Sequence, residues 1–147
     1  MNSDNTQVAP HVPITVAWTG GTEFDASRSG APPVHIDSDA VRGPSPVDLL
    51  LASIATCAAT DVVTILQKQR TPPTSLEVRV ESTRVTSTPR RLASVVLHFV
   101  ITGKGIVQEK ATRAVALSVE KYCSVRSSLA NDISVTWTVD VSERAND

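Results

Sequence analysis

One apolar segment constrains the fold more than any other part of this sequence: residues 47–70, VDLLLASIATCAATDVVTILQKQR. At its start, Ser45-Pro46-Val47-Asp48 resembles a capping box with a proline at the first helical position. The segment ends in Lys68, Gln69 and Arg70, cations and a polar residue suited to a helix C-terminus, and Pro72-Pro73 blocks continuation. Because the predicted helix is apolar nearly all round, we expect it to be buried on most sides, as a long central helix.

A narrow polar stripe interrupts this apolar surface. At about 100° per residue, the side chains of Ser53, Cys57, Thr60, Asp61 and Thr64 fall on one side of the helix, with the cysteine in the middle. Small side chains in such a stripe let another helix approach closely. Alternatively, the stripe lines a cavity with a thiol at its centre. Periodicity alone leaves both interpretations open.

The remainder of the chain alternates in the manner of strands, with turn residues between the runs. Gly20-Gly21 is suited to a hairpin turn, and residues 39–46 are rich in helix and strand breakers. A second helix is expected from about Val107 to Lys121, followed by a short helix that Ser124 would cap. The expected strands are His11–Trp18, Thr22–Ala26, Val34–Asp37, Leu76–Val85, Leu92–Ile101 and Ile133–Val141.

This order of elements predicts an α+β fold with antiparallel sheets rather than a βαβ sheet. At 147 residues and 15.6 kDa the chain has room for one domain of ordinary size, which we place at residues 11–141. Residues 1–10 are polar and residues 142–147 are small and charged, so both are interpreted as tails.

Composition excludes several functional classes. A net charge of -1 offers no electrostatic case for binding nucleic acid. The first dozen residues lack a basic start and an apolar core, and we judge the long helix too short and too interrupted to cross a bilayer, so we expect a cytoplasmic protein without a membrane partner. Two cysteines are too few for a disulfide scaffold or a four-ligand zinc site. The histidines His11, His35 and His98 show no ligand spacing, so no metal or cofactor is expected.

The sequence around the two cysteines resembles a known family. GPSPVDLLLASIATCAATDVVTILQKQR, together with KYCSVRSSL downstream, is similar to the OsmC/Ohr family of thiol-dependent hydroperoxide reductases, and most of all to its OsmC-like branch. Pro46, Leu49 and Cys57 reproduce the spacing before the family's first motif cysteine, and Cys123 stands at the second. The resemblance covers about Val34 to Val141. It implies an intertwined homodimer with the long helix at its centre and two active sites at the subunit interface.

The resemblance also implies roles for the two thiols. Cys57 would attack an organic hydroperoxide and become a sulfenic acid, and Cys123 would condense with it to a disulfide that a dithiol donor reduces. The family's function implies an antioxidant role in stress response. The apolar walls of the long helix would favour a fatty or aryl peroxide over hydrogen peroxide, because burial of each CH₂ contributes about 0.8 kcal/mol.

This chemistry requires Cys57 to react as a thiolate. The residue lies about ten positions inside the helix, beyond the reach of the helix dipole, so a cation must stabilise the thiolate. Catalytic family members use an arginine held by a glutamate immediately after the motif proline, but here that position is Val47. The neighbouring Asp48 would point about 180° away from the thiol, so we interpret it as a carboxylate that starts the helix.

The arginine that serves Cys57 is therefore open. Arg42, in the loop before the helix, is our first choice and Arg28 the second, although either could be an ordinary surface charge. Asp61, one turn beyond Cys57, would oppose the thiolate by like-charge repulsion unless it is neutralised. Whether the loss of the family glutamate abolishes activity is not decided by the sequence.

The surroundings of Cys123 favour a thiolate more than those of Cys57. The residue precedes a short helix, and Lys121 and Arg126 lie nearby. The alternative is an inert thiol buried between two helices.

The function expected first is thus a cofactor-free thiol peroxidase. A second possibility is a non-catalytic dimer of the same fold that binds a small molecule or serves a structural purpose. A third, suggested only by a long helix wrapped by antiparallel strands, is a hot-dog-type thioesterase, for which Asp61 is the only carboxylate on the Cys57 stripe.

Overall fold

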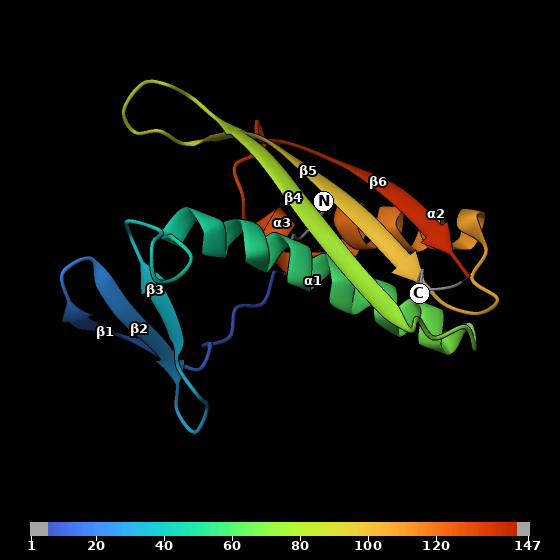
Figure 1. Ribbon diagram of the computed structural model, residues 1–147, viewed down its shortest axis with the longest axis horizontal. Helices are drawn as coiled ribbons and strands as arrows, with labels where there is room; N and C mark the ends of the chain where they lie inside the picture. The colour runs from blue at the N-terminus through green and yellow to red at the C-terminus, as the bar shows by residue number, and fades with distance from the viewer. Residues whose placement is uncertain (1–5, 144–147) are drawn as a thin grey trace. The chain divides into compact units, whose positions relative to one another are not determined.

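The computed structural model describes residues 6–143, and the chain divides into two compact units, Met1–Leu49 and Leu50–Asp147. The outer parts of both predicted tails, residues 1–5 and 144–147, lie outside the described residues. Figure 1 shows the elements in chain order. They are β1 Ile14–Gly20, β2 Glu23–Arg28, β3 Val34–Asp37, α1 Pro46–Lys68, β4 Ser75–Arg84, β5 Leu92–Thr102, α2 Gln108–Leu117, η1 Ser118–Tyr122, α3 Ser124–Ser127 and β6 Ser134–Ser142.

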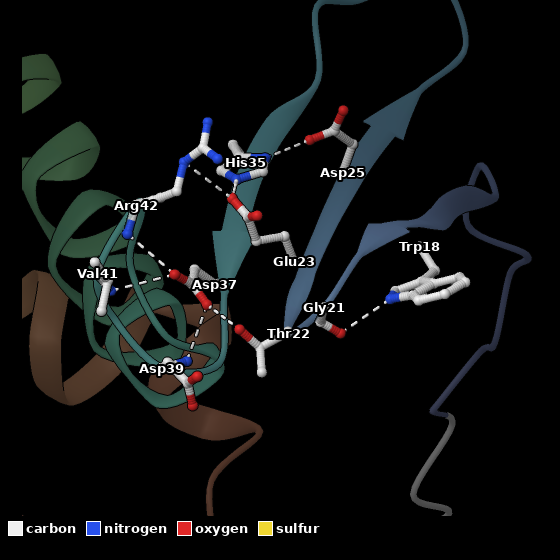
Figure 2. Close-up of polar contacts among 10 residues, drawn as sticks. All are labelled: Trp18, Gly21, Thr22, Glu23, Asp25, His35, Asp37, Asp39, Val41 and Arg42. Atoms are coloured by element: carbon white, nitrogen blue, oxygen red, sulfur yellow. Dashed lines mark hydrogen bonds and ion pairs between the residues drawn. The ribbon is translucent and has the colours of Figure 1, made fainter.

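The first unit contains a three-stranded antiparallel sheet in the order β1-β2-β3. Gly20 and Gly21 form the first turn with φ values of 127° and 55°, which are accessible to glycine at little cost. The Trp18 indole N–H donates to the carbonyl of Gly21 at 3.0 Å and closes this turn from one side (Figure 2). The predicted hairpin is confirmed, although its first strand begins at Ile14 rather than at His11.

Helix α1 begins with the predicted capping box. The Ser45 N–H donates to the Asp48 carboxylate at 2.8 Å, and the Asp48 N–H donates to the Ser45 hydroxyl at 3.1 Å. These hydrogen bonds lower the pKa of Asp48. The interpretation of Asp48 as the carboxylate that starts the helix is confirmed.

The second unit contains a sheet in the order β4-β5-β6. Strands β4 and β5 form the expected antiparallel hairpin, but β5 and β6 are parallel. The α+β class is confirmed, and the expectation of purely antiparallel pairing is wrong for this pair. The helical segment from α2 to α3 carries the chain back to the end of the sheet where β5 began, so β6 runs in the same direction.

The core of this unit lies between the sheet and the helices on one of its faces (Figure 1). Every second side chain along most of β5 is buried, and so is one stripe of α1. On β5 they are Val95, Leu97, Phe99 and Ile101, and on α1 they are Ile54, Ala55, Ala58, Val62 and Leu66. The sheet therefore backs the helix that carries Cys57.

Burial of α1 within the chain is narrower than expected. Only 28% of its most apolar 18-residue window is buried, so the expectation of burial on most sides is wrong for the isolated chain. By length and composition this helix of 23 residues could also cross a membrane, contrary to our judgement from the sequence, because each helical residue adds about 1.5 Å. Its stripe of buried residues against the sheet is that of a core helix.

Candidate functional site

Cys123, the second of the two cysteines expected to react, follows an unusual helical segment. The expected helix from Val107 to Lys121 is α-helical only to Leu117 and continues as the π-helix η1. This segment ends at Cys123, whose backbone N–H donates to the carbonyl of Ser118 at 2.7 Å. A π turn spans one more residue per hydrogen bond than an α turn, and such turns are frequent at functional sites.

The thiol of Cys123 is enclosed. The residue is 2% exposed, and its Sγ lies 3.9 Å from the carbonyl oxygen of Ile54 on α1. The Arg126 backbone N–H donates to the sulfur at 3.3 Å, so Cys123 itself caps α3 and the expected cap, Ser124, does not. The Arg126 guanidinium donates instead to the carbonyl of Ile133 at 3.2 Å.

This environment corrects one expectation from the sequence. Burial raises the pKa of the Cys123 thiol, and the Cys57 sulfur raises it further by hydrogen bonding and by charge, while the Arg126 N–H opposes the rise. The prediction that its surroundings favour a thiolate is therefore wrong. The loss of hydration around the buried thiol raises its pKa by more than the hydrogen bond from the Arg126 N–H lowers it.

Cys57 lies within interaction range of Cys123, on the half-buried flank of α1 beside the buried stripe. Both cysteines are free thiols. The two sulfurs, 66 positions apart in the sequence, are thus brought together in the second unit. The two thiols differ in solvent exposure, because Cys57 is half-buried and Cys123 is buried.

The polar stripe around Cys57 is largely engaged with its own helix. The hydroxyls of Ser53, Thr60 and Thr64 donate to the carbonyls of Leu50, Thr56 and Thr60 at 2.6–2.9 Å. These three hydroxyl groups therefore have their hydrogen-bond donors satisfied within α1.

Asp61 has a partner outside its own helix. The buried Ser118 hydroxyl lies 3.0 Å from the Asp61 carboxylate and 2.9 Å from the Ala58 carbonyl, and donates toward both. Beside Asp61, α1, the last residue of α2 and η1 line an open pocket of about 310 Å³. Its lining combines apolar Ile65, Leu117 and Tyr122 with polar Asp61, Thr64 and Lys68.

Arg42, the arginine expected to serve Cys57, belongs to the first unit (Figure 2). Its Nε lies 3.4 Å from a Glu23 carboxylate oxygen, and its side chain is 74% exposed. The backbone N–H of Arg42 donates to Asp37, which also accepts hydrogen bonds from Thr22 and Asp39. These donors, Thr22 first, lower the pKa of Asp37 to about 2 and order the loop that carries Arg42. Arg28, the second choice, is the exposed last residue of β2.

The same cluster contains a histidine between two carboxylates. His35 Nδ1 lies 2.7 Å from Asp25 and Nε2 lies 2.9 Å from Glu23 (Figure 2). Hydrogen bonding to Asp25, and then to Glu23, raises the pKa of His35. Glu23 therefore bridges His35 and Arg42.

Sequence reasoning missed Glu23 and Asp25 as partners. The alternation of β2 puts these two acids on one face, and the β2–β3 register sets Asp25 opposite His35. The sequence could have indicated these partners only if the pairing of β2 with β3 had been known. Within residues 6–143, no group of three or more His, Cys, Asp or Glu side chains is placed to hold a metal ion.

Comparison with known proteins gives consistent matches. The family model described as "OsmC-like protein" matches residues 37–138. "Protein YhfA" of Escherichia coli strain K12 is 35% identical over 127 residues, which cover 86% of this chain and 95% of YhfA.

Solved structures share the fold. An OsmC-like protein from Mycoplasma pneumoniae is 15% identical with a TM-score of 0.77, over 91% of this chain and 99% of that protein. The organic hydroperoxide resistance protein OhrB of Bacillus subtilis is 18% identical with a TM-score of 0.58, over 87% and 98% respectively.

Proposed function

Because this chain belongs to the OsmC-like protein family, we propose that it is a cysteine-based peroxidase that reduces organic hydroperoxides through Cys57 and Cys123. The observation that carries the proposal is the pair of free thiols in interaction range, one partly open and one enclosed. The solved relative OhrB is named for organic hydroperoxide resistance, which agrees with this substrate class.

In the first step the Cys57 thiolate attacks the distal oxygen of the hydroperoxide. The O–O bond breaks, the sulfur loses two electrons, and the alkoxide leaves as an alcohol after taking a proton from solvent. Cys57 then carries a sulfenic acid.

In the second step the Cys123 sulfur attacks the Cys57 sulfur. An S–S bond forms, the S–O bond breaks, and the hydroxide leaves as water with the thiol proton. An external dithiol reduces the disulfide and restores both thiols. No cofactor enters this sequence of steps.

The different solvent exposure of the two thiols is the basis for assigning the peroxidatic role to one and the resolving role to the other. Cys57 is the better peroxidatic thiol because a substrate can reach its half-buried side. Cys123 is buried and its pKa is raised, so it stays protonated and protected until a sulfenic acid forms beside it.

We assign the activation of Cys57 to Arg42 as part of the same proposal. Catalytic family members hold their arginine with a glutamate at the position of Val47, and Glu23 offers a carboxylate 3.4 Å from Arg42 in its place. Replacement of Arg42 by Lys keeps a charge but removes the planar fork, so it should slow the first step less than replacement by Ala.

We further propose that a second copy of the chain covers the exposed flank of α1. The helix has a mean hydropathy of 2.0 over its most apolar window, of which only 28% is buried within one chain. A homodimer built on this helix would remove that surface from water, and sedimentation should give twice the chain mass.

The decisive experiment measures consumption of cumene hydroperoxide with dithiothreitol as the reductant. The wild-type protein should turn over. The Cys57→Ser variant should be inactive. With dithiothreitol left out, the Cys123→Ser variant should complete one stoichiometric round and then over-oxidise at Cys57. If the wild-type protein consumes the peroxide no faster than Cys57→Ser, the peroxidase proposal fails and a non-catalytic binding or structural function takes its place.

A further inference from the structure

We propose that Ser118, through its hydrogen bonds to Asp61 and Ala58, is the positioning residue that holds the resolving thiol of Cys123 against Cys57. This inference rests on the proposed function for its kinetic meaning. Its geometry is independent of that function, because it concerns only how the π-helix η1 is fastened to α1.

Ser118 connects two elements at a buried point. Its side chain is fully buried, and its hydroxyl lies 2.9 Å from the Ala58 carbonyl and 3.0 Å from the Asp61 carboxylate. Ala58 directly follows Cys57, and Asp61 lies one helical turn further along. The hydroxyl therefore fastens the start of η1 to the part of α1 that carries the peroxidatic cysteine.

The same residue controls the other end of the π turn. The carbonyl of Ser118 accepts the backbone N–H of Cys123 at 2.7 Å, and this bond closes the five-residue turn. The Cys123 sulfur then lies 3.9 Å from the carbonyl of Ile54, one turn before Cys57. The π segment is thus held to α1 on both sides of Cys57, by a strong contact at Ser118 and a weak one at the sulfur.

Disulfide closure depends on such positioning. The bond demands a narrow range of Cα separation and of dihedral angle, and misplacement by about 1 Å can slow a reaction on the order of 100-fold. Cys123 lies between the π turn and the single-turn helix α3, so its position depends on how the π turn is fastened to α1 as well as on α3.

Replacement of Ser118 by Ala removes the hydroxyl and keeps the backbone hydrogen bond between the Ser118 carbonyl and the Cys123 N–H. Oxidation of Cys57 by peroxide should stay within about twofold of wild type, because the partly open side of the thiol is untouched. Closure of the Cys57–Cys123 disulfide should slow on the order of tenfold or more. The waiting sulfenic acid should then be over-oxidised, and the sulfinic acid fraction after excess peroxide should rise, as measured by intact mass.

Two variants of Asp61 separate the hydrogen bond from the charge. Asp61→Asn keeps an acceptor oxygen for Ser118 but removes the negative charge, so it should close the disulfide at nearly the wild-type rate. Asp61→Ala removes one of the two acceptors and leaves the Ala58 carbonyl, so it should slow closure less than Ser118→Ala does. Because Asp61 is only partly buried, these variants remain informative if Ser118→Ala folds poorly. Ser118→Thr restores a hydroxyl and should restore closure.

Equilibrium with glutathione redox buffer gives a readout that needs no peroxide. The Cys57–Cys123 disulfide should be easier to reduce in Ser118→Ala than in wild type, and Ser118→Thr, which keeps the hydroxyl and the charge of Asp61, should match wild type. If the wild-type protein reduces no peroxide but this shift occurs, the proposed function fails and the role of Ser118 stands. If Ser118→Ala, folded by circular dichroism, closes its disulfide at the wild-type rate and potential, or slows both steps equally, the inference is wrong.

Discussion

Two valines on strand β5 allow a test of which face of the β4-β5-β6 sheet is buried against the helices. Val95 on β5 is fully buried, whereas Val100, five residues further along, is 40% exposed. Val95 is paired with Val135 of β6 on the face that backs the helices, and Val100 is paired with Glu77 and Asp140 on the polar outer face. The same substitution, Val→Ala, can therefore be made on both faces of one strand.

The expected losses of unfolding free energy differ. Val95→Ala removes two methyl groups from the core, with a transfer loss of about 1.6 kcal/mol at about 0.8 kcal/mol per group. A residual cavity of roughly 50 Å³ adds about 1.2 kcal/mol if nothing collapses into it, so the range is about 1.6–2.8 kcal/mol. Val100→Ala should lose about 1 kcal/mol, because part of the side chain is already in water and solvent fills the space. The loss of strand propensity is shared by both variants.

Urea unfolding followed by circular dichroism, at one fixed protein concentration, measures both changes. The denaturant slope should be unchanged, so that a shift of midpoint reports stability alone. Equal losses in the two variants would refute the assignment of the faces. A larger loss for Val100 would mean that the outer face, not the helix-backed face, is the buried one.

The remaining predictions concern pH and helix capping. The pKa of His35 is raised above 6.5, so the stabilisation that protonated His35 gives to the β2–β3 pairing should be complete below pH 6.5. It should be lost as the pH rises through the folded-state pKa. Amide exchange of the two strands measures this dependence, and His35→Gln should abolish it. The pKa of Asp37 is lowered to about 2 from 3.8, so the stability that its carboxylate adds to the fold should be present above pH 3.8 and lost as the pH falls toward 2. A carboxyl NMR titration with a midpoint near 3.8 would contradict the hydrogen bonds described. Ser45→Ala should lower the free energy of unfolding by about 1 kcal/mol, measured in urea, whereas no loss would show that the capping box adds nothing in the folded chain.

Local chemistry made much of this molecule predictable. A proline, a serine and an aspartate at fixed spacing determine where α1 begins, because the capping box involves only neighbouring residues. The alternation of residues 92–101 likewise predicted strand β5, since a strand with one face against the helices alternates apolar and polar side chains. The family and the positions of its two motif cysteines also followed from short segments of sequence.

What the sequence left open depends on residues far apart in the chain. The parallel pairing of β6 with β5 depends on how the helical segment between them crosses the sheet. The raised pKa of Cys123 comes from burial beneath α1, and Glu23 becomes a partner of Arg42 only after two strands and a loop have met. Desolvation and ion pairing act through space, and only the tertiary structure decides which groups are close enough to feel them.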